Sequence, residues 1–282
     1  MKNIRLIGFS ILFLMTGAIS SAQELVEYKK IDTTKLSLEV HNPPEFDASK
    51  KYPAMVFFFG GGWVSGDRSH FLNHAKYFAK RGIVCFLADY RTANKHKTTP
   101  FESLKDANSA IRYVRQNASD FSIDPDKIIA SGGSAGGHLA AATALTSGYD
   151  EVTDVSSISH VPNALVLFNP VIDNGPGGYG FERVGEAFVN FSPLHNIRKG
   201  APPTAILLGT KDALVPVETA EYYQKVMEKV GSTCELFLHE GRPHGFFNIG
   251  NFEYYKKTVL EADGFLQKLG YLKEQPKVAI EK

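Results

Sequence analysis

KIIASGGSAGG, residues 127–137, passes from a short apolar run through a glycine-rich turn into an alanine-rich segment. The pattern predicts a strand at 127–130, a sharp turn, and a helix over 135–146. Gly132-x-Ser134-x-Gly136 between a strand and a helix is typical of a nucleophile elbow, a strained turn that exposes a serine hydroxyl. A glycine-rich turn capped by a serine is the alternative interpretation. The strand and the helix around the motif favour Ser134 as a nucleophile.

The rest of the chain alternates apolar strand-like runs with amphipathic segments. We expect further strands at 36–40, 54–59, 83–88, 164–168, 205–208 and 234–238, and further helices at 71–80, 102–117, 217–230 and 252–269. Continuous apolar strands separated by helices indicate a mostly parallel sheet of about eight strands with helices on both faces. Such sheets bind ligands at the carboxyl ends of their strands, so the residues that follow each strand carry the chemistry.

The first 22 residues have the composition of a signal peptide. Lys2 and Arg5 precede an apolar run at 6–19, and small residues at 20–22 predict cleavage after Ala22. An N-terminal membrane anchor is the alternative, but the run is shorter than the roughly 20 apolar residues that span a bilayer. We therefore expect a periplasmic or secreted protein in which residues 23–282 form a single catalytic domain without a large lid.

Composition and charge exclude several classes of function. Without residues 1–22, the chain holds 29 Lys and Arg against 30 Asp and Glu, with no block of like charge. A nucleic acid is therefore not expected as a partner. No second apolar stretch is long enough for stable membrane insertion. Cys85 and Cys234 lie in two separate apolar strands, so we expect two free, buried thiols.

A serine hydroxyl needs a base that is oriented by an acid. When the nucleophile stands at such an elbow, the chain order is serine, then acid, then histidine. His244 lies in the loop between the last strand and the terminal helix, and it is preferred as the base over His239 at the strand end. Asp212 follows the strand at 205–208 and is the preferred acid. Asp173, after the preceding strand, is the alternative acid.

Three consecutive glycines follow the strand at 54–59, in Phe59-Gly60-Gly61-Gly62-Trp63. Glycines let backbone N–H groups turn inward without obstruction by side chains. Acyl transfer needs such donors for the oxyanion that develops on the substrate. We expect Gly61 and Gly62 to donate together with the amide of Ala135, the residue after the nucleophile. The alternative is a plain tight turn.

Five motifs together resemble the α/β-hydrolase esterases of the hormone-sensitive-lipase and acetyl or feruloyl esterase type. They are FGGGW at 59–63, DYR at 89–91, GGSAGG at 132–137, GTKD at 209–212 and HGFF at 244–247, and the similarity covers most of residues 50–270. The resemblance implies an α/β-hydrolase fold, hydrolysis of carboxylic esters without a metal or other cofactor, and a triad of Ser134, Asp212 and His244. One departure is Phe59, because the family usually has a histidine there that shapes the glycine loop.

The substrate is predicted less directly. The short region before the first core strand leaves no room for a large lid, which favours an open site and bulky or polymeric ester substrates. Segment 171–200 is expected to form a loop with one short helix over the site. The aromatic residues expected to contact a sugar or aryl group are Trp63, Tyr90, Tyr179 and Phe246.

We therefore predict a carbohydrate esterase that removes acetyl or feruloyl groups from plant polysaccharide or oligosaccharide. Three other functions stay open from the sequence. Two are enzymes that share the triad order or the glycine loop: a peptidase of the prolyl-oligopeptidase type and an arylformamidase-like amidohydrolase. The third is a catalytically inactive hydrolase fold that serves as a binding module.

Overall fold

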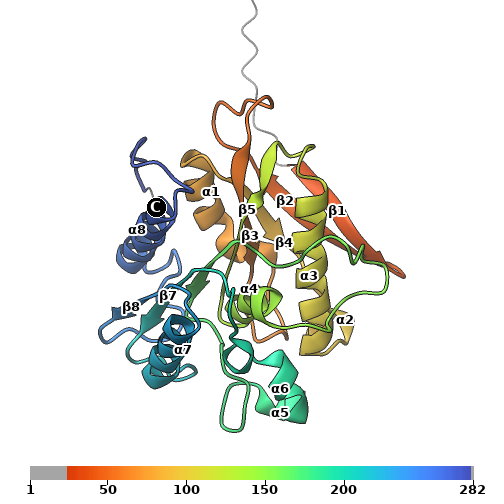
Figure 1. The fold of residues 1–282 in the computed structure, drawn as a ribbon, viewed down its shortest axis with the longest axis vertical. Helices are drawn as coiled ribbons and strands as arrows, with labels where there is room; N and C mark the ends of the chain where they lie inside the picture. Colours follow the sequence, from red (N-terminus) through yellow and green to blue (C-terminus); the bar gives the residue numbers. More distant parts are fainter. Residues whose placement is uncertain (1–23, 281–282) are drawn as a thin grey trace, which may run out of the picture.

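A twisted sheet runs through the centre of the molecule (Figure 1). The structure is a computed structural model that describes residues 24–280, and the predicted signal peptide at 1–22 lies outside this range. Within it, eight strands form one sheet in the order β1-β2-β4-β3-β5-β6-β7-β8. The strands are β1 Glu24–Ile31, β2 Thr34–His41, β3 Tyr52–Phe58, β4 Val84–Ala88, β5 Ile123–Gly133, β6 Ala164–Phe168, β7 Thr204–Gly209 and β8 Cys234–His239.

Strands β3 to β8 run parallel to one another, which confirms the predicted mostly parallel sheet. At one edge β2 is antiparallel both to β4 and to β1. Strand β1 was missed in the sequence, because ELVEYKKI carries four charged residues and no continuous apolar run. A two-residue turn joins β1 to β2, with Asp32 at a φ of 50°, the conformation that tight hairpin turns require.

Five long helices cover the two faces of the sheet, as predicted. They are α1 Leu72–Lys80, α3 Pro100–Gln116, α4 Ala135–Leu145, α7 Val217–Lys229 and α8 Phe252–Lys268. Buried residues of α3, α4 and α7 belong to one apolar cluster, and those of α1 and α8 belong to a second cluster on the opposite face. Helix α3 begins at a capping box between Thr99 and Glu102, with Pro100 in its first turn.

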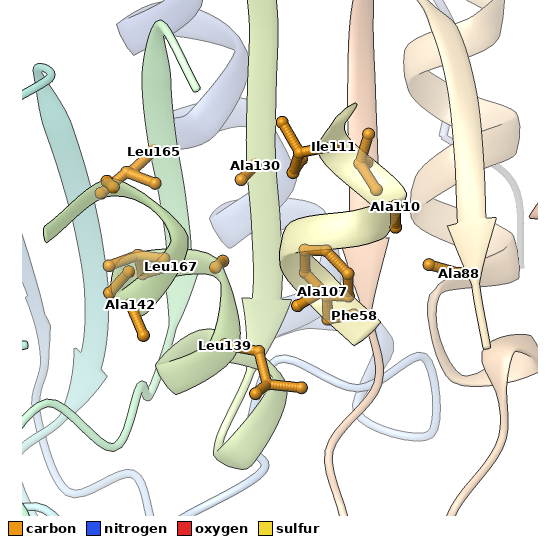
Figure 2. Packing of buried hydrophobic residues seen from close by; sticks show 14 of the residues in the cluster. Phe58, Ala88, Ala107, Ala110, Ile111, Ala130, Leu139, Ala142, Leu165 and Leu167 are labelled. Atoms are coloured by element: carbon orange, nitrogen blue, oxygen red, sulfur yellow. The ribbon is translucent and has the colours of Figure 1, made fainter. Parts of the chain in front are cut away.

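Small side chains let α3 and α4 lie close to the sheet (Figure 2). Every residue of α4 is buried, since alanine and glycine dominate its sequence. The contact brings alanine and leucine side chains of both helices against apolar residues of β3 to β6; they include Phe58, Ala88, Ala107, Ala110, Ile111, Ala130, Leu139, Ala142, Leu165 and Leu167. This packing fixes the start of α4, where the candidate nucleophile lies.

Segment 171–200 differs from the single short helix that we predicted. It contains two helical turns, α5 Phe181–Val184 and α6 Phe188–Phe191, as well as 3₁₀ turns at Gly185–Ala187 and Leu194–Asn196. Figure 1 places α5 and α6 beyond the end of the sheet, and Phe191 of α6 packs on His138 of α4 with ring centroids 4.4 Å apart. Segment 171–200 therefore consists of short helical turns that lie at the carboxyl ends of the strands.

Two smaller predictions concern membranes and thiols. In the part of the chain that the structure describes, no helix combines the length and apolar character needed to cross a bilayer. Cys85 and Cys234 are both free and buried, as predicted. Burial raises the pKa of the Cys234 thiol to about 12, so this sulfur stays protonated at neutral pH.

Candidate active site

The serine of the GGSAGG motif lies on a strained turn between β5 and α4. Ser134 has φ 55° and ψ −122°, a conformation that costs energy for a residue with a side chain. Glycine is required on both sides of it. A Cβ at Gly132 would lie 2.4 Å from the carbonyl oxygen of Gly136, and one at Gly136 would lie 2.1 Å from the carbonyl oxygen of Phe58. The turn is therefore a nucleophile elbow, with its serine at the start of α4.

The structure brings the three predicted triad residues into contact in the predicted order. Ser134 Oγ lies 2.9 Å from His244 Nε2, and His244 Nδ1 lies 2.7 Å from Asp212 Oδ2. The Asp212 side chain is fully buried, whereas His244 keeps about a quarter of its side-chain surface exposed. With Nδ1–H donating to the carboxylate, Nε2 is left free to accept the serine proton.

Backbone amides hold the Asp212 carboxylate in place. Its Oδ1 accepts hydrogen bonds from the amides of Leu214 at 2.8 Å and Val215 at 3.1 Å, so Oδ2 alone faces His244. Oδ1 is thus held by amides of its own loop after β7, and Oδ2 bonds to His244 in the loop after β8. A carboxylate fixed in this way sets the tautomer and the orientation of the imidazole ring.

The two alternative residues lie elsewhere. Asp173 accepts a hydrogen bond from the amide of Gly175 at 2.8 Å, and its carboxylate lies 3.7 Å from His195. His239 is buried at the end of β8, 2.9 Å from Glu261 Oε2. Neither residue contacts Ser134 or His244 within residues 24–280, so the structure brings together the preferred triad and not the alternatives.

The backbone of the glycine loop is held at four successive residues. The Phe59 carbonyl accepts from Tyr90 Oη at 2.8 Å, and the Gly60 amide donates to His70 Nδ1 at 3.0 Å. The Gly61 carbonyl accepts from the amides of Val64 and Ser65 at 3.0 and 3.1 Å. The Gly62 carbonyl accepts from the Arg183 guanidinium. Since Arg183 belongs to α5, segment 171–200 also supports this loop.

These bonds leave specific amides unpaired. The N–H groups of Gly61 and Gly62 donate to no other group within residues 24–280. Ala135 is the first residue of α4, so its amide has no acceptor in the helix. Gly61 and Gly62 line the same cavity as Ser134. The structure therefore presents the three predicted oxyanion donors without competing partners.

A cavity of about 300 Å³ opens above the serine. Its lining combines two triad residues, Ser134 and His244, with the glycine loop and neighbouring loops: Gly60, Gly61, Gly62, His70, Ser134, Asn169, Tyr179, Leu214, His244, Gly245, Phe247 and Asn248. A second hollow of about 250 Å³ shares Tyr179 and Leu214 with this cavity. The two hollows therefore adjoin each other along these two side chains.

Three of the predicted substrate contacts are wrong. Trp63, Tyr90 and Phe246 are 1%, 2% and 3% exposed, and none of them lines the cavity. Trp63 packs into the core beneath segment 171–200, and Tyr90 stacks on Phe59 with ring centroids 3.9 Å apart. Tyr179 does line the cavity. Nearness to a motif in the sequence did not reveal which aromatic rings face solvent.

Three polar residues of the cavity lining, His70, Asn169 and Asn248, were not predicted from the sequence. His70 lies on the 3₁₀ turn Arg68–Phe71 and contacts both Gly60 and Asn248. Asn169, directly after β6, accepts a hydrogen bond from the Gly245 amide at 2.9 Å, and its Nδ2 lies 3.4 Å from His244 Nε2. The position of Asn169 after a strand was a usable signal, whereas no motif marks His70.

These features define a serine hydrolase with the α/β-hydrolase fold. They are a strained serine at a strand-to-helix turn, a histidine and an aspartate from later loops, and free amides beside them.

Comparisons with known proteins give the family. Residues 38–176 match the family model described as BD-FAE. Esterase 2 of Thermogutta terrifontis, in its form phosphoramylated by tabun, is 43% identical, with a TM-score of 0.86 over 90% of this chain and 97% of that one. The chain belongs to the α/β-hydrolase serine esterases.

A second structure of this esterase and one further relative are named with a ligand or a substrate. The propionate-bound structure of the same Thermogutta terrifontis esterase is 42% identical, with a TM-score of 0.86 over 91% of this chain and 97% of that one. An acetylxylan esterase of Xylanibacter ruminicola is 29% identical over 237 residues, which are 78% of this chain and 46% of that protein. The chain spans about half the length of the curated relatives it matches.

Proposed function

We propose that the protein is an exported serine esterase that removes acetyl or feruloyl groups from plant polysaccharide or oligosaccharide. The observation that carries the esterase activity is the contact of Ser134 Oγ with His244 Nε2 at 2.9 Å, beside the free amides of Gly61 and Gly62. The match to the BD-FAE model and the similarity to an acetylxylan esterase support the choice of substrate.

The proposed reaction is acyl transfer in two steps. His244 Nε2 takes the hydroxyl proton of Ser134 while Oγ attacks the ester carbonyl carbon. The carbonyl oxygen becomes an oxyanion that accepts hydrogen bonds from the amides of Gly61, Gly62 and Ala135. His244 then gives the proton to the departing alcohol, which leaves an acyl-enzyme. Water attacks this ester by the same route and releases the carboxylic acid.

The cavity favours a small acyl group. Its volume of about 300 Å³ lies at the lower end of the range for ligand sites, and Phe247 and His70 form part of its wall. The relative from Thermogutta terrifontis binds propionate and butyrate. Among the two acyl groups of our proposal, acetyl is therefore the better fit.

The adjoining hollow is suited to the saccharide. Asp173, Gly177 and Thr219 lie in its lining, and the amides of Gly177 and Tyr179 donate no hydrogen bond within residues 24–280. Asp173 uses only Oδ1 in a hydrogen bond, so Oδ2 is available to accept from a sugar hydroxyl. The Tyr179 ring, between the two hollows, offers an apolar face to a sugar.

The substrate proposal is tested by comparing two esters on the same variants. Wild type should release acetate from acetylated xylo-oligosaccharides and from nitrophenyl acetate. In Asp173→Ala, the KM for the saccharide ester should rise about tenfold, because one hydrogen bond to a charged group is lost, while nitrophenyl acetate is unaffected. Asp126→Ala, an exposed position at the opposite end of β5, is the matched control.

Three outcomes separate the parts of the proposal. Cleavage of nitrophenyl acetate without acetate release from any saccharide overturns the carbohydrate substrate and leaves the esterase. If Asp173→Ala loses activity equally on the saccharide ester and on nitrophenyl acetate, the second hollow is not the saccharide site. Cleavage of an anilide or formanilide at the ester rate favours the amidohydrolase alternatives. Export is tested separately, since N-terminal sequencing of protein from the culture medium or periplasm should begin at Gln23.

A further inference from the structure

A continuous chain of hydrogen bonds joins the glycine loop to the loop of the triad histidine. The Gly60 amide donates to His70 Nδ1 at 3.0 Å, and His70 Nε2 lies 2.6 Å from Asn248 Oδ1. Asn248 Nδ2 in turn donates to the Gly245 carbonyl at 2.9 Å, one residue after His244. Gly60 and His70 are ten residues apart, whereas Asn248 lies 178 residues after His70, so the link between the two loops is a property of the folded site.

The partners of His70 define its protonation state. Nδ1 must carry a lone pair to accept from an amide, and Nε2 must carry the hydrogen that Asn248 Oδ1 accepts. His70 is therefore neutral in this arrangement. Burial lowers the pKa of His70 below its ordinary value, which favours the neutral form at neutral pH.

The titratable groups that face His70 are few. Asp67, which caps its own 3₁₀ turn, opposes the effect of burial. His74 on α1 is itself neutral, because burial lowers its pKa to about 3. Across the cavity, the other titratable side chains in the lining are His244 and Tyr179, while Phe71 and Phe247 cover the His70 ring with apolar surface.

His70 holds the part of the loop that lies closest to the nucleophile. A Cβ placed on Gly60 would lie 3.3 Å from His70 Cε1 and 3.4 Å from Ser134 Cβ. Fixing the Gly60 amide toward His70 fixes the plane of that peptide, and the next two amides are those of Gly61 and Gly62. An error of about 1 Å in donor position is enough to cost roughly 10²-fold in rate.

From this geometry we propose that neutral His70, oriented by Asn248, is a positioning residue that aims the oxyanion donors of Gly61 and Gly62. The inference rests on the proposed esterase activity and adds a second histidine that must be unprotonated for it. It also gives a physical reason why Phe59 is tolerated. The Phe59 side chain stacks on Tyr90, and an imidazole eleven residues later orders the loop from the other side.

Two variants of His70, His70→Asn and His70→Phe, test whether the hydrogen-bond acceptor at Nδ1 is what the loop needs. Asn places an oxygen near the position of Nδ1, whereas Phe keeps the ring and removes the acceptor. His70→Phe should lower kcat on nitrophenyl acetate by about 10²-fold with little change in KM, because the lost interaction acts in the transition state. His70→Asn should recover most of that loss. His160→Asn, another histidine whose pKa burial lowers, is the matched control and should behave as wild type.

The pH profile gives a readout that a purely structural role would not change. As the pH of the wild-type assay is lowered, log kcat/KM should first fall by about one unit per pH unit, because one protonation blocks the reaction. It should steepen to about two units per pH unit at more acidic pH, where His70 and His244 are both protonated. His70→Asn should keep the shallower slope throughout, with folding checked by circular dichroism at each pH.

Asn248→Asp should move the steep part of the profile to higher pH, because a carboxylate 2.6 Å from Nε2 stabilises charged His70 and raises its pKa. The double variant His70→Asn/Asn248→Asp should not show this shift of the pH profile. Its absence would mean that the new carboxylate acts through His70 and not through His244. Equal activity of the Phe and Asn variants, or a two-proton slope that survives in His70→Asn, overturns the inference. If wild type cleaves no ester at all, the proposed function itself has failed.

Discussion

Ser134→Ala should lower kcat on nitrophenyl acetate by about 10⁴-fold or more. Without Oγ there is no covalent intermediate, and the 2.9 Å contact with His244 Nε2 is lost. The residual rate comes from attack of water on the ester while the oxyanion amides stabilise the charge on the carbonyl oxygen, so it should stay above the uncatalysed rate. Initial rates with purified protein, followed by the release of nitrophenol, measure the effect.

Ser131→Ala is the matched control for this variant. Ser131 lies on the same strand three residues earlier, and its hydroxyl donates to the Val166 carbonyl at 2.7 Å, inside the sheet. This variant should be somewhat less stable but should keep its activity. Activity of Ser134→Ala within tenfold of wild type would contradict the assignment of the nucleophile, provided that both variants show native circular dichroism spectra.

Asp212→Asn should lower kcat by about 10⁴-fold, although it changes only one atom of the side chain. The amides of Leu214 and Val215 need an oxygen acceptor, so the amide oxygen must occupy the place of Oδ1. The new NH₂ group then points at His244 Nδ1, which has to become an acceptor. The imidazole hydrogen moves to Nε2, and this atom can no longer take the proton of Ser134.

Asp120→Asn, an exposed position after α3, controls for the loss of one carboxylate and should leave the rate unchanged. A crystal structure of Asp212→Asn should show an unchanged loop after β7, since every donor to this side chain still has an acceptor. A loss of less than tenfold with that loop intact would mean that the carboxylate does not set the histidine tautomer.

The triad was predictable because its geometry follows from sheet topology. In a parallel sheet, the residues after successive strands meet at one edge, so Ser134, Asp212 and His244 lie together although 110 residues separate the first from the last. Their strands β5, β7 and β8 each contain a short apolar run that stands out in the sequence. The glycine triplet was predictable for the same reason, because it follows β3.

The other features depend on contacts that no local pattern encodes. Strand β1 bonds to one neighbour only, so Glu24, Glu27 and Lys30 keep the charges of an exposed edge, while the fourth charge is buried in an ion pair of Lys29 with Asp106. His70 acts through a 3₁₀ turn, and its partner Asn248 lies 178 residues away in the chain. Whether Trp63 or Tyr179 faces the cavity depends on how segment 171–200 folds back, and that segment has no periodic pattern.

Covalent labelling provides the most direct test of the triad. The protein should be treated with a fluorophosphonate, digested, and examined by mass spectrometry, with Ser134→Ala and Asp212→Asn treated in parallel. One adduct should form on the peptide that contains Ser134; it should be absent in Ser134→Ala and should form far more slowly in Asp212→Asn. An adduct on another residue, or an unlabelled Ser134 in a natively folded protein, would contradict the assignment of Ser134 as an activated nucleophile.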